Sequence, residues 1–471
     1  PLFIPSVNTN RMKKISPEFY SIAGLFFFWG FVAASNDVLI PVFKDHLHIQ
    51  QWQSQLISFV FYGAYTFGSI VYIGMSYFVK TDLLQKIGFS KGLSIGLLVS
   101  FAGTLLFIPA AQHSSFTALI FGLFIIGLGF SLQQTAANPL VIAAGDASYG
   151  SQRLSMAGGI NNIGTTIGPL LVSYAVFQGS SQIHHLNDLM YPYLWIGLFF
   201  LFIALVFFRK KQSPLSVPPT YVISAHYFQQ MYALIKKPEV RMAMLAIFLY
   251  VGVEVSTASN LAEFAKHKAS IPTSEIAPYI SLYWASLMIG RWASAADIFA
   301  NTKTKKWIFK ILFSLAALLL FYGILRIHHP SVSNIQWMLV YISVLWLLDI
   351  LSDGDAAKQL LFYALAGSIL MTLAMMTQDR WSVMNMVAVG LFCSTLWPCI
   401  FEIALRGMNT HAGMVSNLLI MMIMGGGWIS VGQAWLSKPL GISGSYIVGV
   451  MCFAYLAFYG WKTHLLQKKQ M

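Results

Sequence analysis

Long apolar stretches, each about the length of a membrane helix, follow one another along this chain. The pattern predicts fourteen spans, because about 20 consecutive apolar residues cross the hydrocarbon core of a bilayer. Open strand edges would leave backbone groups unpaired in lipid, so the spans are predicted to be helices and the fold class all-α integral membrane. The expected ranges are 19–41, 54–79, 88–111, 115–142, 151–178, 190–208, 240–265, 276–299, 306–326, 335–351, 357–377, 382–404, 412–436 and 442–461.

Composition and charge agree with a membrane protein. Hydrophobic residues make up 57% of the chain and charged residues only 10%, whereas soluble domains carry about 25% charged residues. The net charge of +13 would suggest nucleic acid in a soluble protein, but most of the 29 Lys and Arg fall on one side of the predicted spans. Since loops rich in Lys and Arg stay in the cytoplasm, we expect a multi-pass membrane protein with both termini cytoplasmic. Its macromolecular surroundings would be lipid, and nucleic acid is not expected as a partner.

The longest polar connection divides the chain into two bundles. Residues 209–239 begin RKKQSPLSVPP, a Pro-rich linker, and continue into a segment whose apolar and basic residues predict an interfacial helix on the cytoplasmic face. Residues 1–208 then form a six-helix bundle and residues 240–471 a second bundle. The second bundle has two spans more than the first, and we expect the extra pair within about 306–377.

Two acids lie inside predicted spans. Asp37 follows Asn36 in the first span, and Glu254 lies in the middle of the seventh. A carboxylate near the bilayer centre costs about 2.5–3.5 kcal/mol on insertion scales, so each acid needs a partner or a water-filled cavity. Cation coupling is the functional interpretation of both. For Asn36 and Asp37 the alternative is a structural hydrogen bond or a position at the outer mouth.

Neutral amides and aromatic rings at other mid-span positions suit a sugar. Amides offer donors and acceptors to hydroxyl groups, and aromatic rings can stack on the apolar face of a pyranose. The alternatives are hydrogen bonds between helices for the amides and core or interface packing for the rings. The substrate-binding candidates are Asn36, Gln134, Asn138, Asn161, Asn162, Asn260, Tyr283, Trp284, Trp397 and Asn417.

Other polar and small residues have simpler interpretations. Glu402 and Arg406 are spaced i, i+4 near an inner helix end, so they are a possible gate ion pair. Asp349, near the inner end of its span, is expected to reach toward the water. Gly164 and Gly168 have the spacing that allows close helix packing.

Nothing in the sequence indicates catalysis or a bound cofactor. A phosphate-binding G-x-x-x-x-G-K-[ST] motif is absent, and no Cys or His spacing suggests a metal site. Cys393, Cys399 and Cys452 all lie in apolar runs and are expected to pack in the core. We therefore predict a protein that is not an enzyme, has no catalytic residues and no cofactor, and uses only H+ or Na+ as a coupling ion.

Several motifs together resemble one known family. FFFWGFVAASNDVLIPVF, GLGFSLQQTAANPLV, SQRLSMAGGINNIGTTIGPLL, YVGVEVSTAS and LYWASLMIGRW are similar to bacterial sugar permeases of the major facilitator superfamily. The group is that of the L-fucose–proton symporter and the glucose/galactose permeases. The resemblance implies two helical bundles and hexose uptake coupled to a cation gradient by alternating access. It also implies that Asp37 acts in coupling and sugar recognition and that Asn36 matches the neighbouring amide.

The sequence departs from the L-fucose symporter at informative positions. That symporter has a glutamate where this chain has Gln134 and a glutamine where it has Gly158, which favours the glucose/galactose branch. Because Gln134 cannot carry a proton, Glu254 is the leading substitute as the acid that works with Asp37. The expected protein is a monomeric hexose–cation symporter. The alternatives are a symporter or facilitator for another solute, such as an amino sugar or a peptidoglycan fragment, and a sensor that does not transport.

Overall fold

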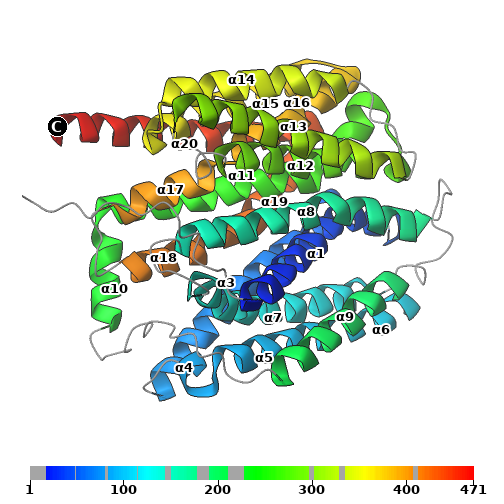
Figure 1. Cartoon of the computed structure of the whole chain (residues 1–471). Coiled ribbons are helices and arrows are strands. Elements are labelled where there is room, and N and C mark those ends of the chain that lie inside the picture. Colours follow the sequence, from blue (N-terminus) through cyan, green and yellow to red (C-terminus); the bar gives the residue numbers. More distant parts are fainter. Residues whose placement is uncertain are drawn as a thin grey trace, which may run out of the picture.

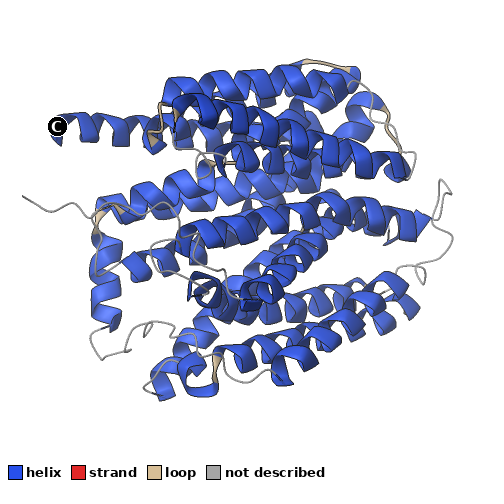
Figure 2. Ribbon diagram, viewed as in Figure 1, coloured by secondary structure: helices blue, strands red, loops and turns tan. Residues whose placement is uncertain are grey.

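The computed structural model describes residues 17–47, 49–79, 83–113, 115–143, 150–177, 190–209, 227–295, 302–327, 335–406 and 412–470. Within these ranges the regular elements are helices and no strand occurs (Figure 2). The predicted all-α fold class is therefore confirmed.

The helices of the first half precede the linker, and those of the second half follow it. The first half contains α1 (Pro17–Leu47), α2 (Gln51–Ser54), α3 (Leu56–Val79), α4 (Leu83–Ile87), α5 (Phe89–Leu105), α6 (Phe107–Gln112), α7 (Phe116–Ala143), α8 (Gly150–Phe177) and α9 (Met190–Arg209). The linker helix is α10 (Tyr227–Lys236). The second half contains α11 (Pro238–Ala269), α12 (Ala277–Ala295), α13 (Lys303–Ile327), α14 (Met338–Ser352), α15 (Ala356–Met376), α16 (Asp379–Cys393), α17 (Leu396–Leu405), α18 (Ala412–Met421), α19 (Gly425–Ser445) and α20 (Ile447–Gln470). Short 3-10 turns lie at η3 (Thr273–Glu275), η5 (Ile335–Trp337) and η7 (Met422–Met424).

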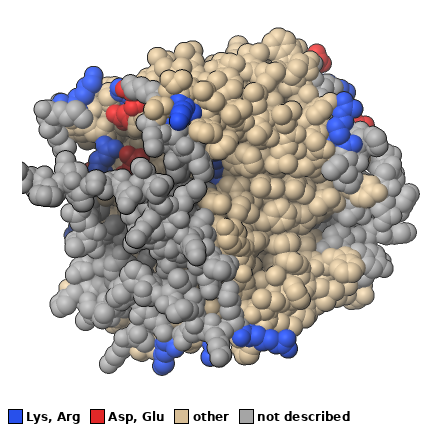
Figure 3. Space-filling view, in the orientation of Figure 1, with Lys and Arg blue, Asp and Glu red and all other residues tan. Residues whose placement is uncertain are grey.

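Length and hydropathy identify membrane helices directly. In the described part of the chain, nine helical segments are long and apolar enough to cross a membrane, and Phe19–Ser35 and Tyr193–Arg209 are shorter apolar helices. Large apolar side chains on their outer faces are exposed, for example Phe202, Leu319 and Ile369. In Figure 3 the charged side chains of the described residues lie mainly toward the rims of the face, and the broad tan area to the right of its centre shows none. That distribution suits a surface in contact with lipid. The total of fourteen spans stays a prediction.

Turn chemistry fixes where the helices of the second half begin and end. Pro238 stands in the first turn of α11, where a missing N–H costs nothing, and Ser270 ends the helix in the left-handed conformation. The turn between α14 and α15 has positive φ at Asp353 and Gly354. Asp355 then caps α15 by accepting hydrogen bonds from the backbone N–H groups of residues 357 and 358.

Small residues bring α1 and α8 into close contact. A Cβ at Gly164 would lie 1.9 Å from the carbonyl oxygen of Phe27, and one at Gly168 would lie 2.6 Å from that of Phe31. The predicted packing role of these glycines is confirmed. The three cysteines are free and buried, as expected for core residues.

The two halves lie against each other, with the earlier helices in the lower part of Figure 1 and most of the later ones above. Their contacts run through α8 with α12, α3 with α19, and α1 with α11 and α12. Helix α10 crosses the ends of the spanning helices, at the end of the bundle where α20 finishes (Figure 1). Its predicted place on the cytoplasmic face stays a prediction, as does the division of the chain into two bundles.

Candidate functional site

Asp37 is bonded to the opposite half of the protein. Its Oδ2 atom accepts a hydrogen bond of 2.9 Å from Nε1 of Trp284, so α1 is tied to α12. Both side chains are buried, with 5% of Asp37 and 7% of Trp284 exposed. The structure therefore gives Asp37 a partner that sequence reasoning had placed among the sugar-binding rings. Glu254, the acid that the sequence suggested would work with Asp37, forms its hydrogen bonds with other residues.

Glu254 lies in a ring of aromatic residues on the second half. Its carboxylate accepts a hydrogen bond from the hydroxyl of Tyr250, and its backbone carbonyl accepts one of 2.8 Å from the hydroxyl of Tyr283. The ring of Tyr250 in turn lies 6.1 Å from that of Trp397, measured between centroids. The predicted residues Glu254, Tyr283 and Trp397 are thus brought together on one wall, with Tyr250 added to them.

Arg291 joins that wall to the first half. Its NH1 atom donates to Oδ1 of Asn162 at 2.9 Å, and its Nε donates to the carbonyl of Ser394 at 3.2 Å. Its NH2 atom lies 3.9 Å from Oε2 of Glu254. Arg291 lies four residues before the end of α12, and charge placement alone would assign it to the cytoplasmic side. Its nearness to the predicted acids is set by tertiary packing, which one sequence does not reveal.

Two tyrosines of α3 form part of the site on the side of the first half. Tyr65 of α3 accepts a hydrogen bond of 3.2 Å from Nε2 of Gln134. Tyr62, one turn earlier, lies close enough for electrostatic interaction with Asp37, Glu254 and Tyr65. Both tyrosines were missed in the sequence, where FVFYGAYTFG is rich in aromatic residues throughout. The hydrogen bond of Tyr65 to Gln134 and the nearness of Tyr62 to the two acids distinguish them from packing residues.

Other predicted residues lie at the contact between helices. Asn161 donates to the carbonyl of Phe26 at 2.8 Å and thereby links α8 to α1. Asn260 accepts a hydrogen bond of 3.1 Å from Gln51, across the two halves. Lys44 and Glu263 form an ion pair between α1 and α11 at the helix ends predicted to be outer. Asn260 thus belongs to a seal between the halves at that end.

The remaining candidates either lie near a helix end or have side chains outside the described part of the structure. Arg406 pairs with Glu402 at 3.0 Å, and both side chains are largely exposed. The pair lies within one helix and does not connect the two halves, so the predicted gate finds no support in this contact. The side chains of Asn36, Asn138 and Asn417 lie outside the described part of the structure. Among the residues that the structure describes, no group of His, Cys, Asp and Glu could hold a metal ion.

Gly290 lets α12 approach the break between α16 and α17. A Cβ at this position would lie 2.1 Å from Oγ of Ser394 and 3.0 Å from the carbonyl oxygen of Leu391. The contact places the neighbouring residue Arg291 against the Ser394 carbonyl.

We expect Gly290→Ala to lower the thermal unfolding temperature of the purified protein and to reduce transport, because α12 must move away from Ser394. Overpacking of this kind costs about 1–3 kcal/mol. Gly323→Ala is the matched control, since Gly323 is a helical glycine of α13 with no atom within 4 Å of the added Cβ. Equal unfolding temperatures for the two variants would contradict the close approach.

Comparison with known proteins identifies the family of this chain. The sequence profile of the Major Facilitator Superfamily matches residues 20–352, more than half of the chain. The chain belongs to the Major Facilitator Superfamily. The family match and the long apolar helices together make it a multi-pass membrane protein.

Named relatives in the superfamily match nearly the whole chain. A glucose/galactose transporter of Brucella abortus is 27% identical over 462 residues, which cover 96% of this chain and 95% of that protein. An L-fucose-proton symporter of Escherichia coli is 24% identical over 457 residues, covering 93% and 90%. Among solved structures, the Escherichia coli fucose:proton symporter FucP matches with a TM-score of 0.63 and 22% identity over 95% of this chain and 98% of that one. The last comparison shows the fold, which agrees with the expected two-bundle family.

Proposed function

We propose that this protein is a secondary active transporter that takes up a hexose, such as glucose or galactose, together with H+ or Na+. The observation that carries the proposal is the hydrogen bond between the buried carboxylate of Asp37 and Trp284, which joins the two halves. Around it lie neutral amides and aromatic rings, the chemistry that fits sugar hydroxyls and pyranose faces. The relatives named above support a sugar as the substrate.

The geometry suggests how a cation and a sugar share one site. A charged carboxylate in a low-dielectric interior is costly, so binding of a proton or a sodium ion at Asp37 stabilises the site by neutralising it. The Trp284 N–H must leave Asp37 before the halves can separate on that side. A cation bound at the Asp37 carboxylate and a sugar oxygen that accepts the freed N–H of Trp284 together replace the hydrogen bond between the halves, which makes both ligands necessary for the change of conformation.

The contacts that seal the predicted outer end indicate which conformation of the transport cycle we propose for this structure. Lys44–Glu263, Gln51–Asn260 and a hydrogen bond of 3.1 Å from Gln55 to the Ser259 carbonyl join the halves there. We propose that this end faces the outside of a bacterial inner membrane, with both termini in the cytoplasm and α10 on the inner surface. In this state the outer path is closed. A single chain contains both halves of the site, so a monomer suffices for transport.

Counterflow in proteoliposomes tests the substrate. Vesicles loaded with an unlabelled hexose are diluted into labelled glucose, galactose or fucose, and uptake is followed over time. We expect exchange of at least one hexose, abolished by excess of the same sugar on both sides. Failure of every hexose would overturn the proposal, and exchange of an amino sugar or peptidoglycan fragment instead would replace the substrate class.

A further inference from the structure

Among the helices that the structure describes, α13 and α14 have no counterpart in the first half. In that half α1 packs along α8, α5 along α7 and α9, and α3 along α7. In the second half the same pattern recurs in α11 along α19, α15 along α16 and α20, and α12 along α16. Superfamily halves are related as repeats, so the helices left over are α13, which packs on α12, and α14, which packs on α15 and α16.

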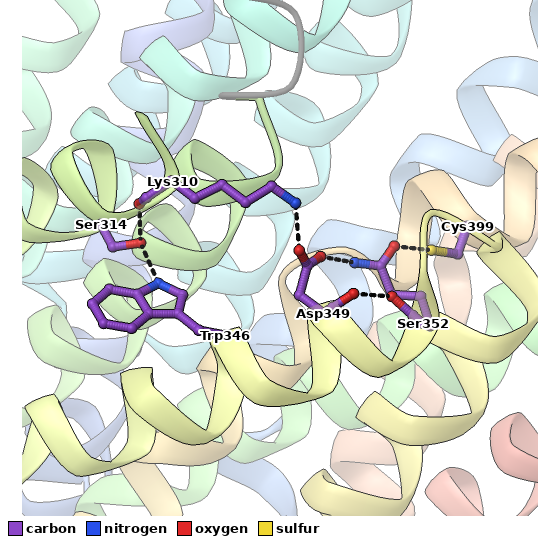
Figure 4. Close-up of polar contacts among 7 residues, drawn as sticks. Lys310, Ser314, Trp346, Asp349, Ser352 and Cys399 are labelled. Atoms are coloured by element: carbon purple, nitrogen blue, oxygen red, sulfur yellow. Dashed lines mark hydrogen bonds and ion pairs between the residues drawn. The ribbon is translucent and has the colours of Figure 1, made fainter. Parts of the chain in front are cut away.

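A polar network connects these two helices to α15 and α17 of the same half (Figure 4). Lys310 of α13 forms an ion pair with Asp349 of α14, and both side chains are mostly buried, at 9% and 16% exposed. Asp349 therefore does not reach into water, contrary to the sequence-based expectation, because a cation on the neighbouring helix meets it inside the protein. Its backbone carbonyl also accepts a hydrogen bond of 2.7 Å from Ser352.

The network continues to α17 through a single glutamine. Gln359 of α15 donates from Nε2 to Oδ1 of Asp349 at 3.2 Å, and its Oε1 accepts from the thiol of Cys399 at 3.3 Å. Cys399 lies in the first turn of α17, two residues after Trp397, and is buried. The side chain of Gln359 thus connects the Lys310–Asp349 pair to the helix that carries Trp397.

Helix α17 begins at a break in its span. Helical conformation stops after Cys393 and resumes at Leu396, and Thr395 has φ −108 and ψ 0. On the site side of this break Arg291 bonds to the carbonyl of Ser394. The break is consequently held by Arg291 at Ser394 and by Gln359 at Cys399, through two different networks.

We propose that α13 and α14 position α17 at this break, with Gln359 as the positioning residue and the Lys310–Asp349 pair as its anchor. The Gln359–Cys399 contact keeps the first turn of α17, and with it Trp397, in register with Tyr250 and Glu254. The consequence for sugar binding rests on the function proposed above. The consequence for the packing of α17 does not depend on it.

Gln359→Met tests the link while leaving both charges in place. Loss of one hydrogen bond corresponds to about a fivefold change in an equilibrium. We expect the KM for counterflow to rise about fivefold with little change in the maximal rate. Labelling of Cys399 by a membrane-permeant maleimide should accelerate by a similar factor, while the equally buried Cys452 of α20 keeps its rate. Thr372→Val, at an exposed position on the same helix, is the control and should change none of these values.

Removing the anchor provides a second, independent arm. The double variant Lys310→Met/Asp349→Leu carries no uncompensated charge, so it should fold with a thermal unfolding temperature near that of the parent. Its Gln359 has lost its anchor, and Cys399 labelling should accelerate as in Gln359→Met. Unchanged Cys399 labelling in both variants would overturn the proposal. A lower unfolding temperature for Gln359→Met without a change in KM or labelling would show a purely structural contact. If the parent exchanges no sugar, the proposed function fails, whereas the labelling result still decides the positioning.

Discussion

Asp37→Asn is expected to abolish accumulation of sugar against its gradient while preserving exchange. Asparagine has the shape of aspartate, and its carbonyl oxygen can still accept the hydrogen bond from Trp284. It cannot take up a proton, and it gives a sodium ion no negative charge. The variant should therefore bind sugar and carry it across in counterflow, but the cation gradient should no longer drive uptake.

Parallel assays of accumulation and counterflow in the same proteoliposome preparation check this result. Glu402→Gln is the matched control, because it makes the same change from acid to amide at an exposed position near a helix end. The control should accumulate sugar like the parent. Undiminished accumulation by Asp37→Asn would remove this residue from the coupling mechanism, and loss of counterflow as well would assign it to sugar binding instead.

Arg291→Met is expected to reduce transport to about 1% or less. The substitution removes the bonds to Asn162 and to the Ser394 carbonyl and leaves Glu254 without its nearby cation. An uncompensated buried charge costs about 3–5 kcal/mol, which corresponds to about 10²–10⁴-fold in the population of a conformation. The contact between the halves and the wall around Glu254 would both be lost.

Initial rates of counterflow for Arg291→Met, Arg291→Lys and Arg406→Met separate charge from geometry. Lysine keeps the charge, but as a point donor it cannot span Asn162 and Ser394 as the guanidinium does, so an intermediate rate is expected. Arg406 is half exposed and pairs only within its own helix, and its loss should have little effect. Equal rates for Arg291→Met and the parent would refute the role of Arg291.

The fold was largely predictable from the chain because the bilayer makes helix the only way to satisfy backbone groups in apolar runs of this length. The small residues Gly164 and Gly168 also showed where α8 would approach another helix. LFCSTLWPCIF was predicted as part of one continuous span, although its Pro398 lacks the N–H that would bond the carbonyl of Ser394. The geometry of the break at residues 394 and 395 depends on Gly290 and Arg291, which approach from a different helix.

The candidate site was only partly predictable. Asp37 and Glu254 stood out because ionised groups are rare in membrane spans, but their partners were not evident. Trp284 reached Asp37 from the other half, and Arg291, close to the end of α12, turned out to bond Asn162 and to lie beside Glu254. The expectation that Asp349 reaches toward the water was wrong for the same reason, because its cation, Lys310, lies on a neighbouring helix. Partners across helices depend on register and rotation, which the sequence pattern leaves open.

Gradient-driven uptake is the most direct measurement of the central claim that a hexose is carried together with a cation. Proteoliposomes holding the protein are given an inward Na+ or H+ gradient with a membrane potential, and labelled hexose is followed to steady state. A potential of about 100 mV acting on one cation is worth about 2.3 kcal/mol, which permits about 50-fold accumulation. The account predicts accumulation with one of the two cations, abolished by an ionophore that collapses its gradient. Hexose that only equilibrates under either gradient would contradict it.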